Sequence, residues 1–185
     1  MLRPPELIVG AQLRLRRSTP ADSAGVFHAA AHAEVMRYME WPAHRAESDA
    51  RAYLEGCAGR WVSGVEYHWV IESRAGDGPL LGCMACRVRG HAADFGHFLA
   101  RQAWGRGAAS EAAGLLLGWL QRQPSILRIW ATTDVDNHRA ARLLERLGLQ
   151  REGVLHMATV RPNLGGPPRD TAIYAVCKAP PLDAA

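Results

Sequence analysis

Long apolar segments are missing from this sequence of 185 residues. No stretch approaches the ~18 to 20 uninterrupted apolar residues that a membrane-spanning helix needs. The N-terminal segment MLRPPELIVG has neither the apolar core nor the small-residue cleavage site of a secretory signal. We therefore expect no membrane partner and a cytoplasmic location.

Runs of like charge, internal repeats and long linkers are missing as well. The formal net charge is +4, yet the arginines are dispersed and form no interaction tail. This balance suits an anionic ligand and does not predict a nucleic-acid partner. The apolar share of 48% and the charged share of 22% are ordinary for a globular protein. We expect one domain over residues 1–185, with a frayed tail over residues 179–185.

Cysteine is scarce, with four residues scattered along the chain. Only Cys83 and Cys86 have the spacing of a metal-binding or redox pair. They lie within LLGCMACRV, which predicts a buried strand, and Cys57 and Cys177 are isolated. A zinc site would need a second pair, so we expect small core residues here and no metal site.

The hydrophobic pattern predicts an α/β (α+β) fold in which strands and helices are interleaved. The turn sequence GDGP joins two of the strands and predicts a β-hairpin. Strands are expected over residues 13–19, 67–72, 80–88, 92–99, 126–133, 149–160 and 171–177. Helices are expected over residues 20–38, 47–62, 107–121 and 136–148.

The most informative stretch is GHFLARQAWGRGAASEA, from Gly96 to Ala112. It predicts a strand that ends in a loop, with Gly105 and Gly107, and a helix that starts directly after the loop. Free backbone amides at a helix start carry partial positive charge, and glycines leave room for an approaching phosphate. The stretch therefore predicts an anion site, with a plain tight turn as the alternative.

Taken together, the elements and two motifs resemble the GCN5-related N-acetyltransferases over nearly the whole chain. Gln102, Gly105 and Gly107 match the acetyl-coenzyme A signature of that family, and Asn137 followed by ARLLERLGL is similar to its helix after the fifth strand. AEVMRYMEWP, DFGHFL and the Arg-Asp pair before TAIYAV are similar to the branch of ribosomal-protein alanine N-acetyltransferases (RimJ/RimL-like). The resemblance implies a mostly antiparallel sheet of six to seven strands with about four helices, splayed between its fourth and fifth strands.

The resemblance also implies which residues hold acetyl-CoA. They are Phe98, Leu99, Ala100, Gln102, Ala103, Trp104, Gly105, Arg106, Gly107, Ala108, Asn137 and Arg142. The backbone of residues 98–100 is expected to bind the pantetheine arm, and the amides of residues 103–108 the pyrophosphate. Asn137 is expected to bond the pantetheine from the other side, or else only to cap its helix. Arg106 and Arg142 are candidates for phosphate contacts, with solvated arginines as the alternative.

The catalytic groups are less clear from the sequence. Asp94 and His97 are rival candidates for the general base, because strand alternation places them on opposite faces. Glu40, Glu66 and His68 are looser candidates near the acceptor side, where Tyr38 and Trp41 either line the acceptor site or cover the core. Leu144 and Ala140 stand where the family carries tyrosine or serine, so the sequence predicts no side chain as general acid.

These features predict an acetyl-CoA-dependent N-acetyltransferase that acts on a primary amine, first of all a protein or peptide N-terminus. Two alternatives stay open: an enzyme for a small amine such as an amino acid, polyamine or aminoglycoside, and a non-catalytic acyl-CoA-binding module. The basic net charge weakens the polyamine and aminoglycoside alternatives. By resemblance, a homodimer is expected.

Overall fold

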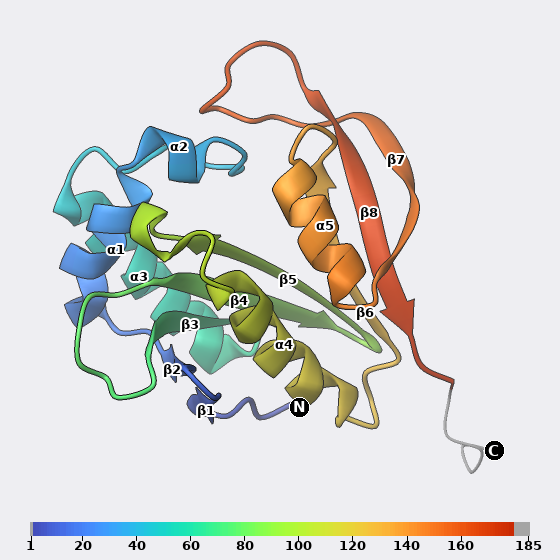
Figure 1. Ribbon diagram of the computed structural model, residues 1–185, viewed down its shortest axis with the longest axis horizontal. Coiled ribbons are helices and arrows are strands. Elements are labelled where there is room, and N and C mark those ends of the chain that lie inside the picture. Colours follow the sequence, from blue (N-terminus) through green and yellow to red (C-terminus); the bar gives the residue numbers. More distant parts are fainter. Residues whose placement is uncertain (1, 180–185) are drawn as a thin grey trace.

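The computed structural model describes residues 2–179, which form one eight-stranded sheet with the order β1-β2-β3-β4-β5-β6-β8-β7 (Figure 1). All neighbouring strands are antiparallel except β5 and β6, which are parallel. The strands are β1 (Leu7–Val9), β2 (Leu13–Arg17), β3 (Glu66–Ser73), β4 (Gly82–Arg89), β5 (Ala92–Leu99), β6 (Arg128–Asp134), β7 (Gln150–Thr159) and β8 (Arg169–Cys177). The α-helices are α1 (Ser23–Ala30), α2 (Ala33–Met36), α3 (Glu47–Ser63), α4 (Ala108–Gln121) and α5 (His138–Arg146), and Pro20–Asp22 and Arg101–Ala103 form short 3₁₀ turns. The expected mixed, mostly antiparallel architecture is confirmed.

Two elements differ from the expectation. The short strand β1 pairs with β2, which raises the number of strands to eight. The single helix expected over residues 20–38 is divided, because the backbone is extended at His32 (φ −80°, ψ 114°). The break lets Val26 of α1 and Met36 of α2 bury their side chains in the same cluster. Since neither glycine nor proline lies at the break, the local sequence contains no signal for it.

The sheet separates two apolar cores. One core lies between the sheet and α4 and includes Trp69 and Leu116, and the other lies under α1 and α3 and includes Val70 and Leu54. Cys83 belongs to the core under α1 and α3, whereas Cys86 belongs to the core beside α4. The two cysteines are buried core residues on opposite faces of β4, and this geometry does not let them ligate one ion.

The strands β5 and β6 diverge, and this divergence creates the space for a ligand. They pair only between Ala92–Asp94 and Arg128–Trp130. Beyond these residues β6 moves away together with α5 and the β7–β8 hairpin (Figure 1). From Phe95 to Leu99 the edge of β5 that faces β6 therefore has no strand partner, which is the splay expected between the strands over residues 92–99 and 126–133.

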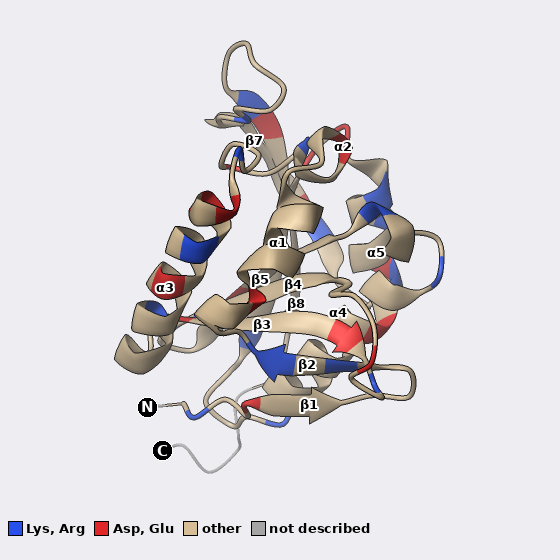
Figure 2. Cartoon of the chain, turned by 90° about the vertical axis from the view of Figure 1, so that its left-hand side faces the viewer, with Lys and Arg blue, Asp and Glu red and all other residues tan. Residues whose placement is uncertain are grey.

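The basic residues of β2, blue in Figure 2, are paired with acidic residues of neighbouring elements. Arg14 and Arg16 of β2 both bond Glu72 of β3, and Arg16 also bonds Asp22. No helix within residues 2–179 is long and apolar enough to cross a membrane. Of the tail expected to fray, residues 180–185 lie outside the described residues.

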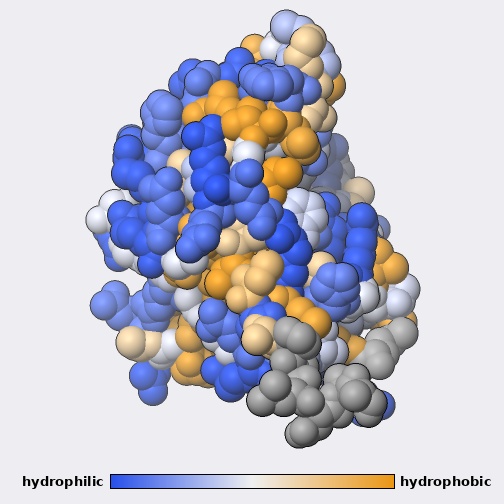
Figure 3. Space-filling view, turned by 90° about the vertical axis from the view of Figure 1, so that its right-hand side faces the viewer, coloured by the Kyte–Doolittle hydropathy of each residue, from blue (hydrophilic) through white to orange (hydrophobic). Residues whose placement is uncertain are grey.

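The opposite end of the sheet is formed by β7, an exposed edge strand. Figure 3 shows the face that carries β7 and β8, where hydrophobic residues lie among hydrophilic ones. Leu155 and Met157 of β7 are 49% and 62% exposed. The expected homodimer stays a prediction, and this edge is the surface on which we would test it first.

Candidate functional site

A cleft of about 350 Å³ opens where β5 and β6 diverge. It brings together predicted residues from distant parts of the chain, namely Tyr38, Glu40, Trp41, Glu66, His68, His97, Phe98 and Asn137. Ala140 and Leu144 line it as well, so the two positions without a proton donor do face this space. Asp94 and Arg142 are not among the lining residues.

The glycine loop has the geometry of an anion site. Gly105 and Gly107 adopt positive φ angles of 75° and 78°, and a Cβ atom at either position would meet no other atom within 4 Å. In residues 2–179, the amides of Gly105 through Ser110 donate no hydrogen bond to the protein. Free amides of this kind at the start of a helix fit a pyrophosphate.

The predicted set of loop amides needs a correction at its start. The amide of Ala103 donates to the carbonyl of Ala100 (2.9 Å), and that of Trp104 donates to Arg101 (3.3 Å). Both amides are therefore used within the short 3₁₀ turn. The backbone amides that remain free lie closer to α4 than predicted. They include the amide of Ser110, which the motif alone does not indicate.

The predicted backbone contacts of β5 also need a correction. The amide of Ala100 donates to the carbonyl of Leu81 (2.8 Å), and the carbonyl of Ala100 accepts a bond from the amide of Ala103. The carbonyl of Phe98 faces β4, where it lies so close to Gly82 that a side chain at that position would collide with it. Backbone groups alternate along a strand, so His97 and Leu99 face the open edge. The Leu99 carbonyl accepts a bond from Trp104 Nε1 (2.9 Å). The amide of Leu99 and the backbone of His97 therefore remain available on the open edge, and His97 is a candidate that sequence reasoning missed.

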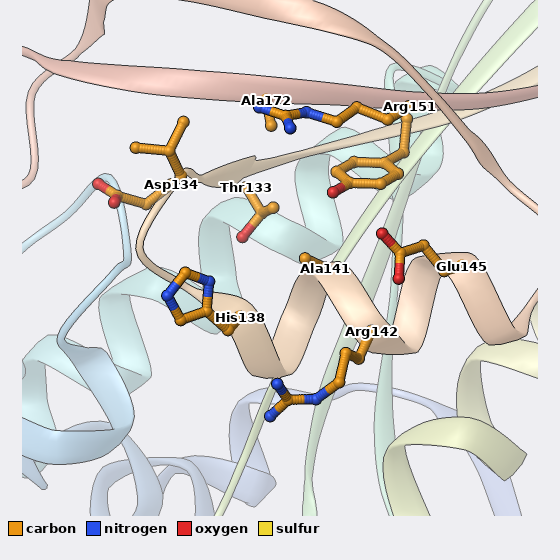
Figure 4. Close-up of a pocket in the computed structure, with 10 residues that line it drawn as sticks. Thr133, Asp134, His138, Ala141, Arg142, Glu145, Arg151 and Ala172 are labelled. Carbon is orange, nitrogen blue, oxygen red and sulfur yellow. The ribbon is translucent and has the colours of Figure 1, made fainter.

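Trp104 is held between two arginines beside the glycine loop. The guanidinium carbon of Arg101 lies 4.8 Å from the centre of its ring, and that of Arg139 lies 5.0 Å from it. Arg142 instead lines a separate pocket on another side of α5, with His138 and Glu145 beside it and Arg151 across from it (Figure 4). Arg139, which is 3 residues before Arg142, is therefore the arginine of α5 that lies against Trp104 of the loop. The helical period of α5 contained the signal for this distinction.

The position of Asn137 is compatible with both roles that the sequence left open. Its Oδ1 atom caps α5 by accepting a bond from the amide of Ala140 (3.3 Å). The residue also lines the cleft, where its side-chain NH₂ group remains as a donor. Gln102 and Arg106 are both exposed to solvent near the loop.

The rival base candidates are placed very differently. Asp94 is buried and its Oδ2 atom accepts bonds from Arg87 Nε (2.7 Å) and Nη2 (2.5 Å). The Asp94 carboxylate is therefore engaged in this ion pair, and it does not line the cleft. His97 is half-buried and lines the cleft, and burial lowers the pKa of its imidazole to about 4.

The looser base candidates are also occupied. His68 is fully buried, with its ring nitrogens 2.9 Å from Ser18 Oγ and 2.9 Å from Tyr53 Oη, and burial lowers its pKa to about 3. Glu66 accepts a bond from Arg60 Nε (2.9 Å). Glu40 is 53% exposed and accepts a long bond from Arg161 (3.3 Å).

Sequence reasoning missed a charged cluster at the end of β6. The carboxylate of Asp134 is fully buried and accepts bonds from Arg169 Nε (2.6 Å) and Nη2 (3.1 Å). Burial by itself would raise the pKa of Asp134, but the hydrogen bonds from Arg169 and from the amide of Asp136 hold it below the usual value. Arg169 also bonds the carboxylate of Asp136, so the cluster ties β8 to the turn that precedes α5.

Asn163, also missed, joins two loops over the cleft. Its Nδ2 atom donates to the carbonyls of Met36 (2.7 Å) and Trp41 (2.8 Å), and its Oδ1 atom accepts a bond from the amide of Ala43 (2.8 Å). The loop between β7 and β8 is thereby fixed to the segment that carries Tyr38 and Glu40. Contacts between residues more than a hundred positions apart leave no signal in a single sequence.

Known proteins are similar to this chain in sequence and in fold. The model of the acetyltransferase (GNAT) domain matches residues 12–150. The uncharacterized N-acetyltransferase YoaA of Bacillus subtilis (strain 168) is 27% identical over 169 residues, which cover 90% of this chain and 94% of YoaA. An acetyltransferase of the GNAT family from Bacillus anthracis is 22% identical, and its structure superposes with a TM-score of 0.80. The alignment covers 92% of this chain and 98% of the Bacillus anthracis chain. RimL, a ribosomal L7/L12 alpha-N-protein acetyltransferase in complex with coenzyme A, is 20% identical and superposes with a TM-score of 0.81. The alignment covers 93% of this chain and 98% of the RimL chain.

Proposed function

Since this chain belongs to the GNAT acetyltransferase family and uses acetyl-CoA to acetylate amines, we propose that its acceptor is the α-amine of a peptide or protein N-terminus. The bound cofactor supplies an acetyl thioester, whose carbon the amine attacks. The free amides of Gly105 through Ser110 are suited to the pyrophosphate, and the open edge of β5 and Asn137 to the pantetheine.

The proposal rests on one observation: the side chains that line the cleft and could accept a proton are weak general bases. Among the described residues that line it, the carboxylates are Glu40 and Glu66, and both accept bonds from arginines. The imidazoles are His68 and His97, and burial lowers the pKa of both. None of these groups is suited to remove a proton from an amine with a pKa near 10.

A peptide α-amine needs much less help from a general base to lose its proton. Its pKa is about 7.7 to 8.0, against about 10.4 for a lysine side chain. Near pH 7.5 roughly a third of α-amines are already neutral, against about a thousandth of lysine amines. A cleft with weak bases therefore favours acceptors that arrive as the free amine. The similar fold of RimL, an alpha-N-protein acetyltransferase, supports the same acceptor class.

The acceptor class can be tested with two matched peptides. One has a free N-terminus and no lysine, and the other has a blocked N-terminus and one lysine. At pH 7.5 we expect kcat/KM to be at least ~100-fold higher for the free N-terminus, because of the difference in neutral amine. Thiol release with acetyl-CoA and mass spectrometry of the products measure this. Faster acetylation of the lysine peptide or of a polyamine would overturn the proposal, and coenzyme A binding without transfer to any amine would favour a binding module.

The role of His97 gives a second test. A dedicated general base contributes typically about 10²- to 10⁴-fold to the rate. Because the pKa of His97 is lowered to about 4, we expect His97→Gln to reduce kcat by less than about tenfold. For the same reason kcat/KM should rise with pH between 6 and 8 as the acceptor amine loses its proton, with no step from His97. A loss above ~100-fold at unchanged coenzyme A affinity would instead identify His97 as the base.

A further inference from the structure

Arg161, in the loop after β7, lines the acceptor cleft although its side chain is only 5% exposed. Its Nε atom has no hydrogen-bond partner within residues 2–179, and the carboxylate of Asp134 is 3.9 Å away. Its Nη1 atom makes a long bond of 3.3 Å to Glu40. A guanidinium group has five N–H donors, so most of the donor capacity of this buried group is not used by the protein. Such a group is costly to bury unless a ligand completes its hydrogen bonds.

The position of Arg161 is fixed by the backbone. Its carbonyl accepts bonds from the amides of Leu164 (3.0 Å) and Gly165 (3.2 Å), which close a tight turn. Within this turn Asn163 is bonded to the segment of Met36, Trp41 and Ala43. The guanidinium group is therefore presented to the cleft from a preorganised loop, which is what a specificity contact requires.

The charges around Arg161 indicate what kind of group it can bind. Two guanidinium groups, of Arg161 and Arg169, face the three carboxylates of Asp134, Asp136 and Glu40. The cluster already has an excess of negative charge, so a further carboxylate from an acceptor would be repelled. A neutral oxygen can accept the free N–H groups without this repulsion.

We propose that Arg161 donates hydrogen bonds to a neutral carbonyl oxygen next to the acceptor amine, and so selects α-amino amides, as in a peptide N-terminus, over free amino acids and plain amines. This inference rests on the proposed function and adds the group by which the acceptor is recognised. Arg161 acts as a specificity residue, and the transfer chemistry does not depend on it.

The test compares alaninamide with isopropylamine, which lacks the carbonyl group, and with alanine, which carries a carboxylate. In the Arg161→Gln variant we expect kcat/KM for alaninamide to fall at least about tenfold, chiefly through KM, and that for isopropylamine to change less than about twofold. Each acceptor is compared with itself in wild type and variant, so differences in amine pKa cancel. Wild type should prefer alaninamide to alanine, and the variant should lose much of that preference.

Two further variants separate recognition from folding. Arg169→Lys disturbs the same cluster from outside the cleft and should lower stability without changing the preference for alaninamide. Arg161→Lys keeps the charge beside Asp134 but loses the planar fork, and it should fold while losing part of the preference. Coenzyme A affinity should stay the same in both.

The outcomes are distinguishable. Equal losses for alaninamide and isopropylamine would show that Arg161 is structural, and a weaker coenzyme A affinity would assign it to the cofactor; either result overturns the inference. If wild type acetylates isopropylamine as well as alaninamide after correction for neutral amine, the inference is wrong and the transferase activity stands. If wild type acetylates no amine, the proposed function itself fails.

Discussion

A valine in place of Gly107 is expected to raise the dissociation constant of coenzyme A at least about tenfold. Gly107 precedes α4 with φ at +78°, and the space beside it is open. A branched side chain would enter the region into which the free amides of the loop point, and it would separate them from the pyrophosphate. The left-handed backbone adds a strain of roughly 1 to 2 kcal/mol for a residue with a Cβ atom. Titration calorimetry with coenzyme A measures the affinity, and thermal unfolding measures the strain.

Gly148 provides a matched control for this variant. It has φ at +84° and open space around it, but it follows α5 and lies outside the glycine loop. Gly148→Val should therefore show a similar strain with coenzyme A affinity within about twofold of wild type. Gly107→Asn, whose side chain tolerates the left-handed region, should weaken coenzyme A binding with less loss of stability. Wild-type affinity in Gly107→Val would show that this loop does not hold the cofactor.

The Asp134→Asn variant is expected to lose about 3 kcal/mol or more of its free energy of unfolding. The Asp134 carboxylate is fully buried and is the shared partner of Arg169 and, at a longer distance, of Arg161. An amide in its place leaves two guanidinium groups near each other without their common counter-charge, and breaking a buried ion pair typically costs about 3 to 5 kcal/mol. Urea unfolding at pH 7 measures the loss, which corresponds to a fall in Tm of roughly 6 to 12 °C.

Asp136 supplies the control that separates the loss of a carboxylate charge from the loss of a buried one. Its side chain bonds Arg169 as well, but it is 63% exposed. Solvent screens such a pair, so Asp136→Asn should cost at most about 1 kcal/mol. If both variants lose the same stability, burial of Asp134 is not the cause and the cluster does not organise the end of β6.

Much of the fold could be predicted because its signals are local. The alternation in β2, the turn between β3 and β4, and the apolar period of α4 each depend on neighbouring residues, and these elements formed close to the expected bounds. The division of the first helix at His32 could not be predicted, since it depends on which side chains are buried together in the core. The strand β1 was missed because three residues carry too little pattern.

The difference between features set by neighbouring residues and features set by packing also applies within the site. The glycines at positions 105 and 107 and the helix start after them are readable in sequence because the anion site is built from consecutive amides. Which amides are free depends on how Ala103 and Trp104 bond in the preceding turn, and this shifts the site toward Ser110. Likewise the period of α5, together with its packing, decides that Arg139 and not Arg142 lies beside Trp104.

The sequence by itself determined the family resemblance, the cofactor class and the glycine loop that we propose for the pyrophosphate, because these depend on short segments whose backbone geometry is set by local residues. Only the tertiary structure decided which side chains line the cleft. It pairs Asp94 with Arg87, lowers the pKa of His97 by burial, and brings Arg161 to the cleft through the bonds of Asn163. Pairing, burial and contacts between distant loops arise only when the chain is folded, and the proposed proton chemistry and specificity of the site rest on them.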